Sequence, residues 1–260
     1  MTLVQNTLSY RGPRSNMLFR MIDGLMIKPF LLGSDVILCN SQFTRDEVRS
    51  KIGSAARIEV VCCGFNELPP SLRARKEDGY FHVLFSGQCS YVKGLTYLLR
   101  AFSLLDEKNV ILDIVGNYES DKNYFELLKK MVKGSPYKKC IFFHGHIRDK
   151  TKLAQFYADA DIFCLPSLYE GFGIVLLEAM SFGLPIVGTT AGSIPELVKD
   201  EQNGLLVPPA NAEALAAALK RLINSAELRQ KLGANGRKRF ESSQKFYSWD
   251  KTCERVLSAL

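Results

Sequence analysis

The sequence has no run of about 18 apolar residues, which predicts that no helix of this chain spans a membrane. It has no C-x-x-C pair, and its seven cysteines and three histidines are not spaced as zinc ligands are. Its first residues lack a charged segment followed by an apolar core, so a signal peptide is not predicted. Internal repeats and low-complexity segments are also missing. With 47% hydrophobic and 23% charged residues, the composition excludes collagen, coiled coil and wholesale disorder.

The cysteines that are present indicate reduced thiols. Cys62 and Cys63 are adjacent, and Cys89, Cys140 and Cys164 lie in or beside apolar runs. A free cysteine packs as a small apolar residue, and stable disulfides are rare in reducing compartments. The sequence therefore predicts a cytoplasmic protein.

The charge is unbalanced, with 34 Lys and Arg against 27 Asp and Glu, a net charge of +7. A basic surface attracts nucleic acid, an anionic membrane or a phosphorylated ligand. Few aromatic residues interleave with the basic stretches, as a nucleic-acid platform requires, so no nucleic-acid partner is predicted. The basic triplet at residues 237–239 is interpreted as a solvated helix face. Peripheral contact with the inner face of a membrane stays open as a separate hypothesis.

Short apolar runs alternate with helical patterns from about residue 71 to 225. The runs occupy 82–85, 110–115, 141–143, 162–165 and 186–187, and the helical patterns 94–105, 122–132, 150–158, 173–182 and 212–223. Uninterrupted apolar strands favour a sheet that is covered on both faces. The alternation predicts right-handed β-α-β units and an α/β fold with a doubly wound, parallel, Rossmann-like sheet.

The two ends of the chain are less regular. A helix-like stretch covers 17–32, and apolar runs at 36–38 and 58–61 flank a capped helix that ends at Gly53. This is predicted to be too little for a domain with its own sheet. Residues 246–260 are predicted to form a terminal helix that carries Trp249.

Ligands bind an open α/β sheet at the carboxyl ends of its strands, so the strand-to-helix turns are the candidate site. The turn after 82–85 contains Gly87, Gln88 and Lys93. A glycine there lets a ligand approach the backbone, and a lysine near a helix start can meet a phosphate. A loop with a solvated lysine is the simpler interpretation and stays open. The turn after 110–115 begins with Gly116, which is common in any α/β fold.

The turn after 162–165 carries the strongest signal. Glu170 stands beside two glycines that open the next helical pattern, where free backbone N–H groups favour a negative ligand. Glu170 lies outside that helix and can accept hydrogen bonds from hydroxyl groups. Glu178 lies in the apolar stretch IVLLEAM, where a lone carboxylate should be paired or functional. A salt bridge from Glu178 to a neighbouring Lys or Arg is the structural alternative.

Glu170 and Glu178 flank seven residues, and this E-x7-E spacing resembles the motif of retaining GT-B glycosyltransferases. The segment ADADIFCLPSLYEGFGIVLLEAMSFGLPIVGT, followed by GSIPELV and NGLLVPP, is similar to the nucleotide-sugar-binding half of family 4 (glycosyl transferases group 1). The resemblance extends back through FSGQCSYVKGLTYLLRAF and SDVILCNSQFTRDEV and forward to YSWDKTCERVL. It implies the C-terminal half of a GT-B fold.

The resemblance also implies roles for individual residues. Glu178 would hold the ribose hydroxyls, and Glu170 would hold the donor sugar. Lys93 would neutralise the departing diphosphate, which makes Lys93 and Glu170 the catalytic candidates. The other donor-binding candidates are backbone positions or a neighbouring amide: Gly87, Gln88, Gly116, Ile147, Gly171, Phe172 and Gly173. Gln88 is a departure, because the family often has Arg there, and a neutral side chain leaves Lys93 more of the diphosphate charge.

No metal ion and no cofactor are predicted, and the nucleotide sugar is a co-substrate. Asp159 and Asp161 spell the D-x-D of metal-dependent transferases, but they precede a strand, at the end opposite the site. His144 and His146 follow a strand at the ligand edge, where contact with a base or phosphate and a structural role are both open.

The predicted function is therefore retaining, metal-independent glycosyl transfer from a nucleotide-diphosphate sugar to a glycan or lipid-linked saccharide. Residues 1–65 would be the remnant of an N-terminal domain and crossover, 66–245 the Rossmann-like domain, and 246–260 a C-terminal helix. Since the family's acceptor site comes from its N-terminal domain, transfer is expected to need that half or a separate partner chain. A non-catalytic nucleotide-sugar-binding module and an inactive interaction subunit are the alternatives.

Overall fold

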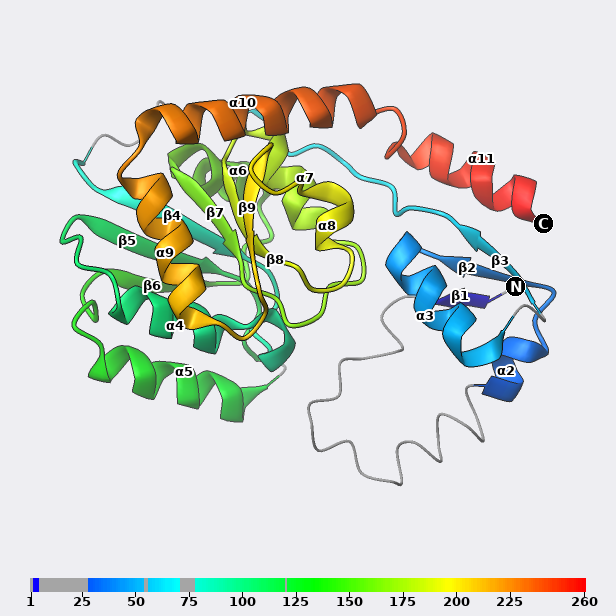
Figure 1. Ribbon diagram of the computed structural model, residues 1–260, viewed down its shortest axis with the longest axis horizontal. Helices are drawn as coiled ribbons and strands as arrows, with labels where there is room; N and C mark the ends of the chain where they lie inside the picture. Colours follow the sequence, from blue (N-terminus) through cyan, green and yellow to red (C-terminus); the bar gives the residue numbers. More distant parts are fainter. Residues whose placement is uncertain (1, 5–27, 54–55, 71–77, 120) are drawn as a thin grey trace.

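The main unit is a six-stranded parallel sheet (Figure 1). The computed structural model describes residues 2–4, 28–53, 56–70, 78–119 and 121–260. The strand order is β6-β5-β4-β7-β8-β9, and all neighbouring strands run parallel. Their bounds are β4 (Phe81–Ser86), β5 (Val110–Val115), β6 (Ile141–Gly145), β7 (Ile162–Leu165), β8 (Ile186–Thr189) and β9 (Gly204–Val207). The predicted doubly wound α/β fold is confirmed.

The strand order reverses at the centre of this sheet. From β4 the chain moves outward through α4 (Leu95–Ser103) and α5 (Lys122–Gly134) to β6, and α6 (Lys150–Asp159) returns it to β7 on the other side of β4. Because such crossovers are right-handed, α4 and α5 cover one face, whereas α6 and α7 (Ile174–Ser181) cover the other. The loops that follow β4 and β7 therefore diverge and open a crevice at the carboxyl edge.

The central strands are buried because their side chains are apolar on both faces. All four residues of β7 and of β8 are buried, as the uninterrupted runs predict. Most helices begin at a side-chain cap. Asp149, for example, accepts from the backbone N–H of Thr151 at the start of α6, and Asn211 accepts from that of Ala214 at the start of α9 (Ala212–Ile223).

Helix α10 (Ala226–Ser243), whose bounds were not predicted, follows α9 and packs across α7. Two glycines inside α10 weaken the sequence signal for a helix. One of them has a packing reason, since a Cβ on Gly233 would lie 2.1 Å from the carbonyl oxygen of Gly183. The prediction of a solvated face at residues 237–239 is only partly correct. Lys238 is exposed, but Arg237 is half-buried and donates to the Ser181 carbonyl, and Arg239 donates to the Glu196 carbonyl.

A second, three-stranded parallel sheet corrects the prediction that residues 1–65 form no sheet of their own. Its order is β1-β2-β3, with β1 (Thr2–Val4), β2 (Val36–Cys39) and β3 (Arg57–Val60). Helices α2 (Lys28–Leu32) and α3 (Gln42–Ile52) accompany it, and Ile37, Cys39 and Val48 form part of its buried cluster. Of the predicted helix at 17–32, residues 17–27 lie outside the described part. We call residues 28–65, with β1, the N-terminal unit.

The last helix packs against this smaller sheet. After α10 the chain turns and α11 (Trp249–Ala259) runs beside the N-terminal unit (Figure 1). Val256 and Ala259 of α11 pack against Val36, Leu38 and Val61. The predicted terminal helix is confirmed, although it begins at Trp249, because the Ser248 side chain caps it by accepting from the Lys251 N–H. Across the described helices, none is both long and apolar enough to cross a membrane.

Candidate functional site

A cavity of about 320 Å³ lies at the crevice between the loops that follow β4 and β7. Six of the predicted site residues line it: Gly87, Gln88, Lys93, Glu170, Phe172 and Gly173. The remaining lining residues are Asn40, Cys63, Ser86, Leu165, Ile174 and Val175. Residues separated by more than 80 positions in the sequence thus meet at one edge of the sheet.

The two loops of this crevice interlock through their backbones. The Leu168 N–H donates to the Val92 carbonyl at 2.7 Å. Gly94 adopts a left-handed φ of +71°, and a Cβ at this position would lie 1.9 Å from the carbonyl oxygen of Pro166. Only glycine fits such an approach, so Gly94 brings the 3-10 turn Tyr91–Lys93 against the loop after β7.

That interlock places Lys93 beside Glu170. The Lys93 Nζ donates to Glu170 Oε2 at 2.7 Å, and the side chains are 20% and 6% exposed. A nearly buried carboxylate requires such a partner, since an unpaired buried charge is strongly destabilising. The pair leaves Lys93 partly open to the cavity, so its positive charge is available to a ligand.

The backbone of Glu170 is fixed from the loop after β8. The N–H and hydroxyl of Ser193 both donate to the Glu170 carbonyl, at 2.9 and 3.1 Å. A Cβ on Gly192, whose φ is +62°, would lie 2.2 Å from the same oxygen. Three loops therefore hold this carboxylate in one orientation.

Helix α7 begins at the cavity. Its N-cap, Gly173, has a φ of +88°, and no side chain caps the helix. The first N–H groups of α7 are thus available at the crevice, where the helix dipole favours a negative group by about 0.3–1 kcal/mol at exposed sites. This arrangement can bind a phosphate.

Glu178, one turn further along α7, has a buried phenol as its partner. The Tyr157 hydroxyl donates to Glu178 Oε2 at 2.5 Å, so the alternative of a salt bridge is not what the structure shows. Burial raises the pKa of Glu178, and the hydrogen bond from Tyr157 and the charge of Lys150 oppose that rise. Burial and the nearby carboxylate hold the pKa of Tyr157 well above its usual range, while a hydrogen bond from Ser86, which lines the cavity, opposes this.

Four predicted residues, Gly116, Ile147, Gly171 and Glu178, are outside the cavity lining. Gly116 has a clear packing role, because a Cβ there would lie 1.6 Å from the carbonyl oxygen of Gly87. Gly171 is buried between Glu170 and Phe172, and Ile147 packs against the main core. Their roles toward a ligand stay predictions.

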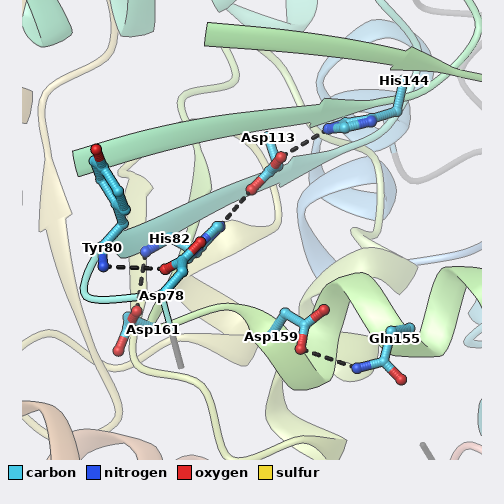
Figure 2. A network of polar contacts seen from close by, with 8 residues as sticks. All are labelled: Asp78, Tyr80, His82, Asp113, His144, Gln155, Asp159 and Asp161. Atoms are coloured by element: carbon cyan, nitrogen blue, oxygen red, sulfur yellow. Dashed lines mark hydrogen bonds and ion pairs between the residues drawn. The ribbon is translucent and has the colours of Figure 1, made fainter. Parts of the chain in front are cut away.

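A polar network crosses the sheet beyond this cavity (Figure 2). Asp113 on β5 accepts from His144 at 2.7 Å and pairs with His82 at 2.8 Å, and His82 also lies 3.3 Å from Asp78. Burial raises the pKa of Asp113, but the two histidines outweigh it and the pKa is lowered. His144 thus has a structural partner, whereas His146 is exposed.

The D-x-D residues lie just before β7, with Asp159 the last residue of α6, at the opposite edge of the sheet from the cavity. Asp161 accepts from the His82 N–H at 2.9 Å, and Asp159 accepts from Gln155 at 2.9 Å (Figure 2). In the described part of the chain, no three His, Cys, Asp or Glu side chains gather as metal ligands would.

Six lining residues were not predicted, and two of these, Asn40 and Cys63, come from the N-terminal unit. Asn40 is buried, and its Oδ1 accepts from the Thr44 hydroxyl at 3.0 Å. Asn40 directly follows β2, and this position at the end of a strand was the sequence signal that could have marked it as a candidate site residue. The cavity therefore has one wall from each unit.

The comparisons with known proteins agree with this fold. The family described as glycosyl transferases group 1 matches residues 71–239, and the chain belongs to this family. An uncharacterized glycosyltransferase of Methanocaldococcus jannaschii is 34% identical over 177 residues, which cover 68% of this chain and 43% of that protein. The chain thus matches less than half the length of that relative.

Two solved structures show the same architecture, that of GT-B glycosyltransferases. Sucrose-phosphate synthase from Thermosynechococcus elongatus superposes with a TM-score of 0.81 at 25% identity, over 97% of this chain and 63% of that one. The Anabaena protein HepE, solved in complex with UDP and glucose, superposes with a TM-score of 0.74 at 22% identity, over 87% of this chain and 64% of that one.

Proposed function

We propose that the chain binds a nucleoside-diphosphate sugar in the cavity between the loops after β4 and β7, as part of a retaining, family 4-like glycosyltransferase. The observation that carries the proposal is the Lys93–Glu170 ion pair, 2.7 Å long, at the mouth of a cavity where helix α7 also begins. A cation, a buried carboxylate and free backbone N–H groups are the three groups that a sugar diphosphate requires.

Each group has a separate task in this proposal. The diphosphate lies at the start of α7, where Gly87 and Gly173 let it approach the backbone. Glu170 accepts hydrogen bonds from the sugar hydroxyls. As the sugar–phosphate bond breaks, negative charge builds on the leaving diphosphate, and Lys93 with the α7 amides stabilises it. These groups supply the positive charge that a metal ion supplies in metal-dependent transferases.

Lys93 has little help in that task. Among the described residues that line the cavity, it alone carries a cationic side chain, and Gln88 contributes only a neutral amide. Removal of Lys93 should therefore weaken diphosphate binding more than removal of a surface lysine. The ribose is assigned to Glu178 and the base to the neighbourhood of Gly116 and Ile147, beyond the cavity itself.

The acceptor and the remainder of the enzyme are further parts of the proposal. Because the curated relative is longer than the matched region, we infer that transfer also requires an N-terminal half, in the same polypeptide or as a separate chain. The cleft wall at Asn40 and Cys63 is where that half would bring a glycan or lipid-linked acceptor. A cytoplasmic location, with peripheral contact at the inner face of a membrane, suits the basic net charge of +7.

A thermal-shift panel of UDP, GDP, ADP and their sugars tests the proposal. At about a hundred times its dissociation constant, a ligand adds about 2.7 kcal/mol of stability, which corresponds to about 5–10 °C for a chain of this size. Wild-type protein should respond to at least one nucleotide sugar, and UDP is the first candidate because HepE was solved with it.

Two substitutions localise the binding. Lys93→Met and Glu178→Ala should abolish most of the shift, whereas Lys129→Met should not, since Lys129 pairs with Glu126 on the surface of α5. No response to any nucleotide or nucleotide sugar would overturn the proposal. Binding without sugar transfer, measured with the complete protein and a range of acceptors, would reduce it to a binding module.

A further inference from the structure

Helix α3 of the N-terminal unit lies against the loops that hold Glu170, and its first turn is bound by a carboxylate from the main unit. Glu196, on α8 (Ile194–Leu197), accepts from the backbone N–H groups of Gln42 at 3.1 Å and Phe43 at 2.8 Å. Each carboxylate oxygen takes one of the two N–H groups. These are unpaired groups of a helix start, and a negative charge is favoured there.

A second contact joins α3 to the loop after β7. The Tyr169 hydroxyl donates to Glu47 Oε2 on α3 at 2.7 Å. The Tyr169 ring also meets the Phe43 ring edge-on, with the centroids 5.5 Å apart. Burial and the Glu47 carboxylate raise the pKa of Tyr169, so the phenol remains a hydrogen-bond donor at any physiological pH.

Both contacts involve segments that adjoin Glu170. Tyr169 precedes it in the sequence. Glu196 lies in the segment whose Ser193 donates twice to the Glu170 carbonyl. The carbonyl of Glu196 is itself held by Arg239 on α10 at 2.9 Å. The loop that carries Glu170 is thus held by the main unit on one side and by α3 on the other.

We propose that Tyr169 and Glu196 are positioning residues, which hold the Glu170 loop against α3 so that sugar recognition in the main unit depends on the N-terminal unit. The inference rests on the proposed function. Neither residue lines the cavity, and neither is assigned a contact with the ligand. Both act through the orientation of Glu170.

This arrangement has a specific consequence for affinity. Glu170 is assigned to the sugar, whereas the start of α7 and Lys93 are assigned to the diphosphate. Loosening the loop should therefore weaken binding of the nucleotide sugar more than binding of the free nucleoside diphosphate. A residue that only stabilised the fold would change both affinities equally.

Calorimetric titration of four variants tests the proposal: Tyr169→Phe, Glu47→Gln, the double variant of these two, and Glu196→Gln. Each is titrated with the nucleotide sugar that wild type binds and with the matching free nucleoside diphosphate. Tyr80→Phe and Glu213→Gln are controls, since both side chains are exposed. Circular dichroism establishes that each variant is folded at the temperature of titration.

Tyr169→Phe and Glu196→Gln should each weaken nucleotide-sugar binding about 5- to 20-fold, which is about 1–1.8 kcal/mol, and free-nucleotide binding less than 3-fold. The double variant of Tyr169 and Glu47 should lose no more than the larger single loss, since both changes act on the same contact and Tyr169→Phe already removes it. The inference would be overturned if Tyr169→Phe and Glu196→Gln bound with wild-type affinity, or if they lost affinity equally for the nucleotide sugar and the free nucleotide. Either result would leave the proposed function standing. If wild type binds no nucleotide sugar, the proposed function fails first.

Discussion

The Tyr157 hydroxyl donates to Glu178 Oε2 across 2.5 Å, and the phenol that makes this bond is wholly buried. A carboxylate in such surroundings is costly to ionise, and the hydrogen bond from Tyr157 is what lowers the cost. The carboxylate that the E-x7-E spacing points to is thus held by a residue 21 positions earlier, on α6.

Tyr157→Phe removes this donor without changing the ring. A hydrogen bond to a charged group contributes about 1.5–3 kcal/mol, and its loss should raise the already elevated pKa of Glu178 further. We expect the variant to bind nucleotide more weakly than wild type at pH 7. As the pH rises, binding should increase more steeply in the variant than in wild type. Calorimetry between pH 5.5 and 8.5 measures this, with Tyr80→Phe as the control. An identical pH profile in variant and wild type would contradict the assignment.

His82→Gln should destabilise the protein in a pH-dependent way. The hydrogen bond with Asp113 raises the pKa of His82 above its ordinary value, against the opposing effect of burial. Because the pKa of His82 is higher in the folded state, its contribution to stability is complete at a pH below its pKa in the unfolded chain. The contribution is lost as the pH rises through its pKa in the folded protein.

Urea unfolding at pH 5.5 and at pH 9 checks this expectation. The loss of stability in His82→Gln should be about 1.5–3 kcal/mol at the lower pH and smaller at the higher. His146→Gln is the matched control, because His146 is exposed. A loss that is the same at both pH values would indicate that packing rather than charge explains the effect of His82.

Gly94→Ala should separate the two loops of the candidate site. The added Cβ would lie 1.9 Å from the Pro166 carbonyl oxygen, in addition to the strain of a left-handed φ of +71°. Gly183→Ala is the control, since Gly183 has a φ of +67° but the nearest atom to its added Cβ lies at 3.9 Å. The left-handed strain alone costs roughly 1–2 kcal/mol. Gly94→Ala should therefore lose clearly more stability than Gly183→Ala. Equal melting temperatures for the two variants would show that the loops do not interlock.

Gly64→Ala should displace the one tryptophan of the chain. A Cβ at Gly64 would lie 2.2 Å from the ring of Trp249, which stands at the start of α11. Because Trp249 is the single tryptophan, fluorescence reports on this contact alone. The emission maximum should shift to longer wavelength as the half-exposed ring gains solvent contact. Gly134→Ala, where no atom lies within 4 Å, should leave the spectrum unchanged. An unshifted spectrum in Gly64→Ala would count against this docking of α11.

The sequence predicted the main sheet well because its signals are local. The strand at 162–165 and the helix at 212–223 have the bounds predicted from their apolar patterns. The turn glycines were found because each follows a strand. Helix α10 was not delimited, since Gly233 allows a close approach to the loop after α7, and that reason exists only in three dimensions.

The N-terminal unit marks the opposite limit. Its sheet was not predicted, because β2 pairs on one side with Thr2–Val4, more than 30 residues earlier in the chain. Asn40 follows a strand, but nothing near it or near Cys63 in the sequence indicates the main unit as a neighbour, so both were missed as cavity residues.

By itself, the sequence determined the alternation of strands and helices, the E-x7-E spacing and the glycines at strand ends, because each depends on a few neighbouring residues. Only the tertiary structure decided the partners of the carboxylates. Glu170 meets Lys93, Glu178 meets Tyr157, and Glu196 meets the start of α3. A buried charge needs a partner wherever the folded chain provides one, and the fold brings those partners from distant parts of the sequence.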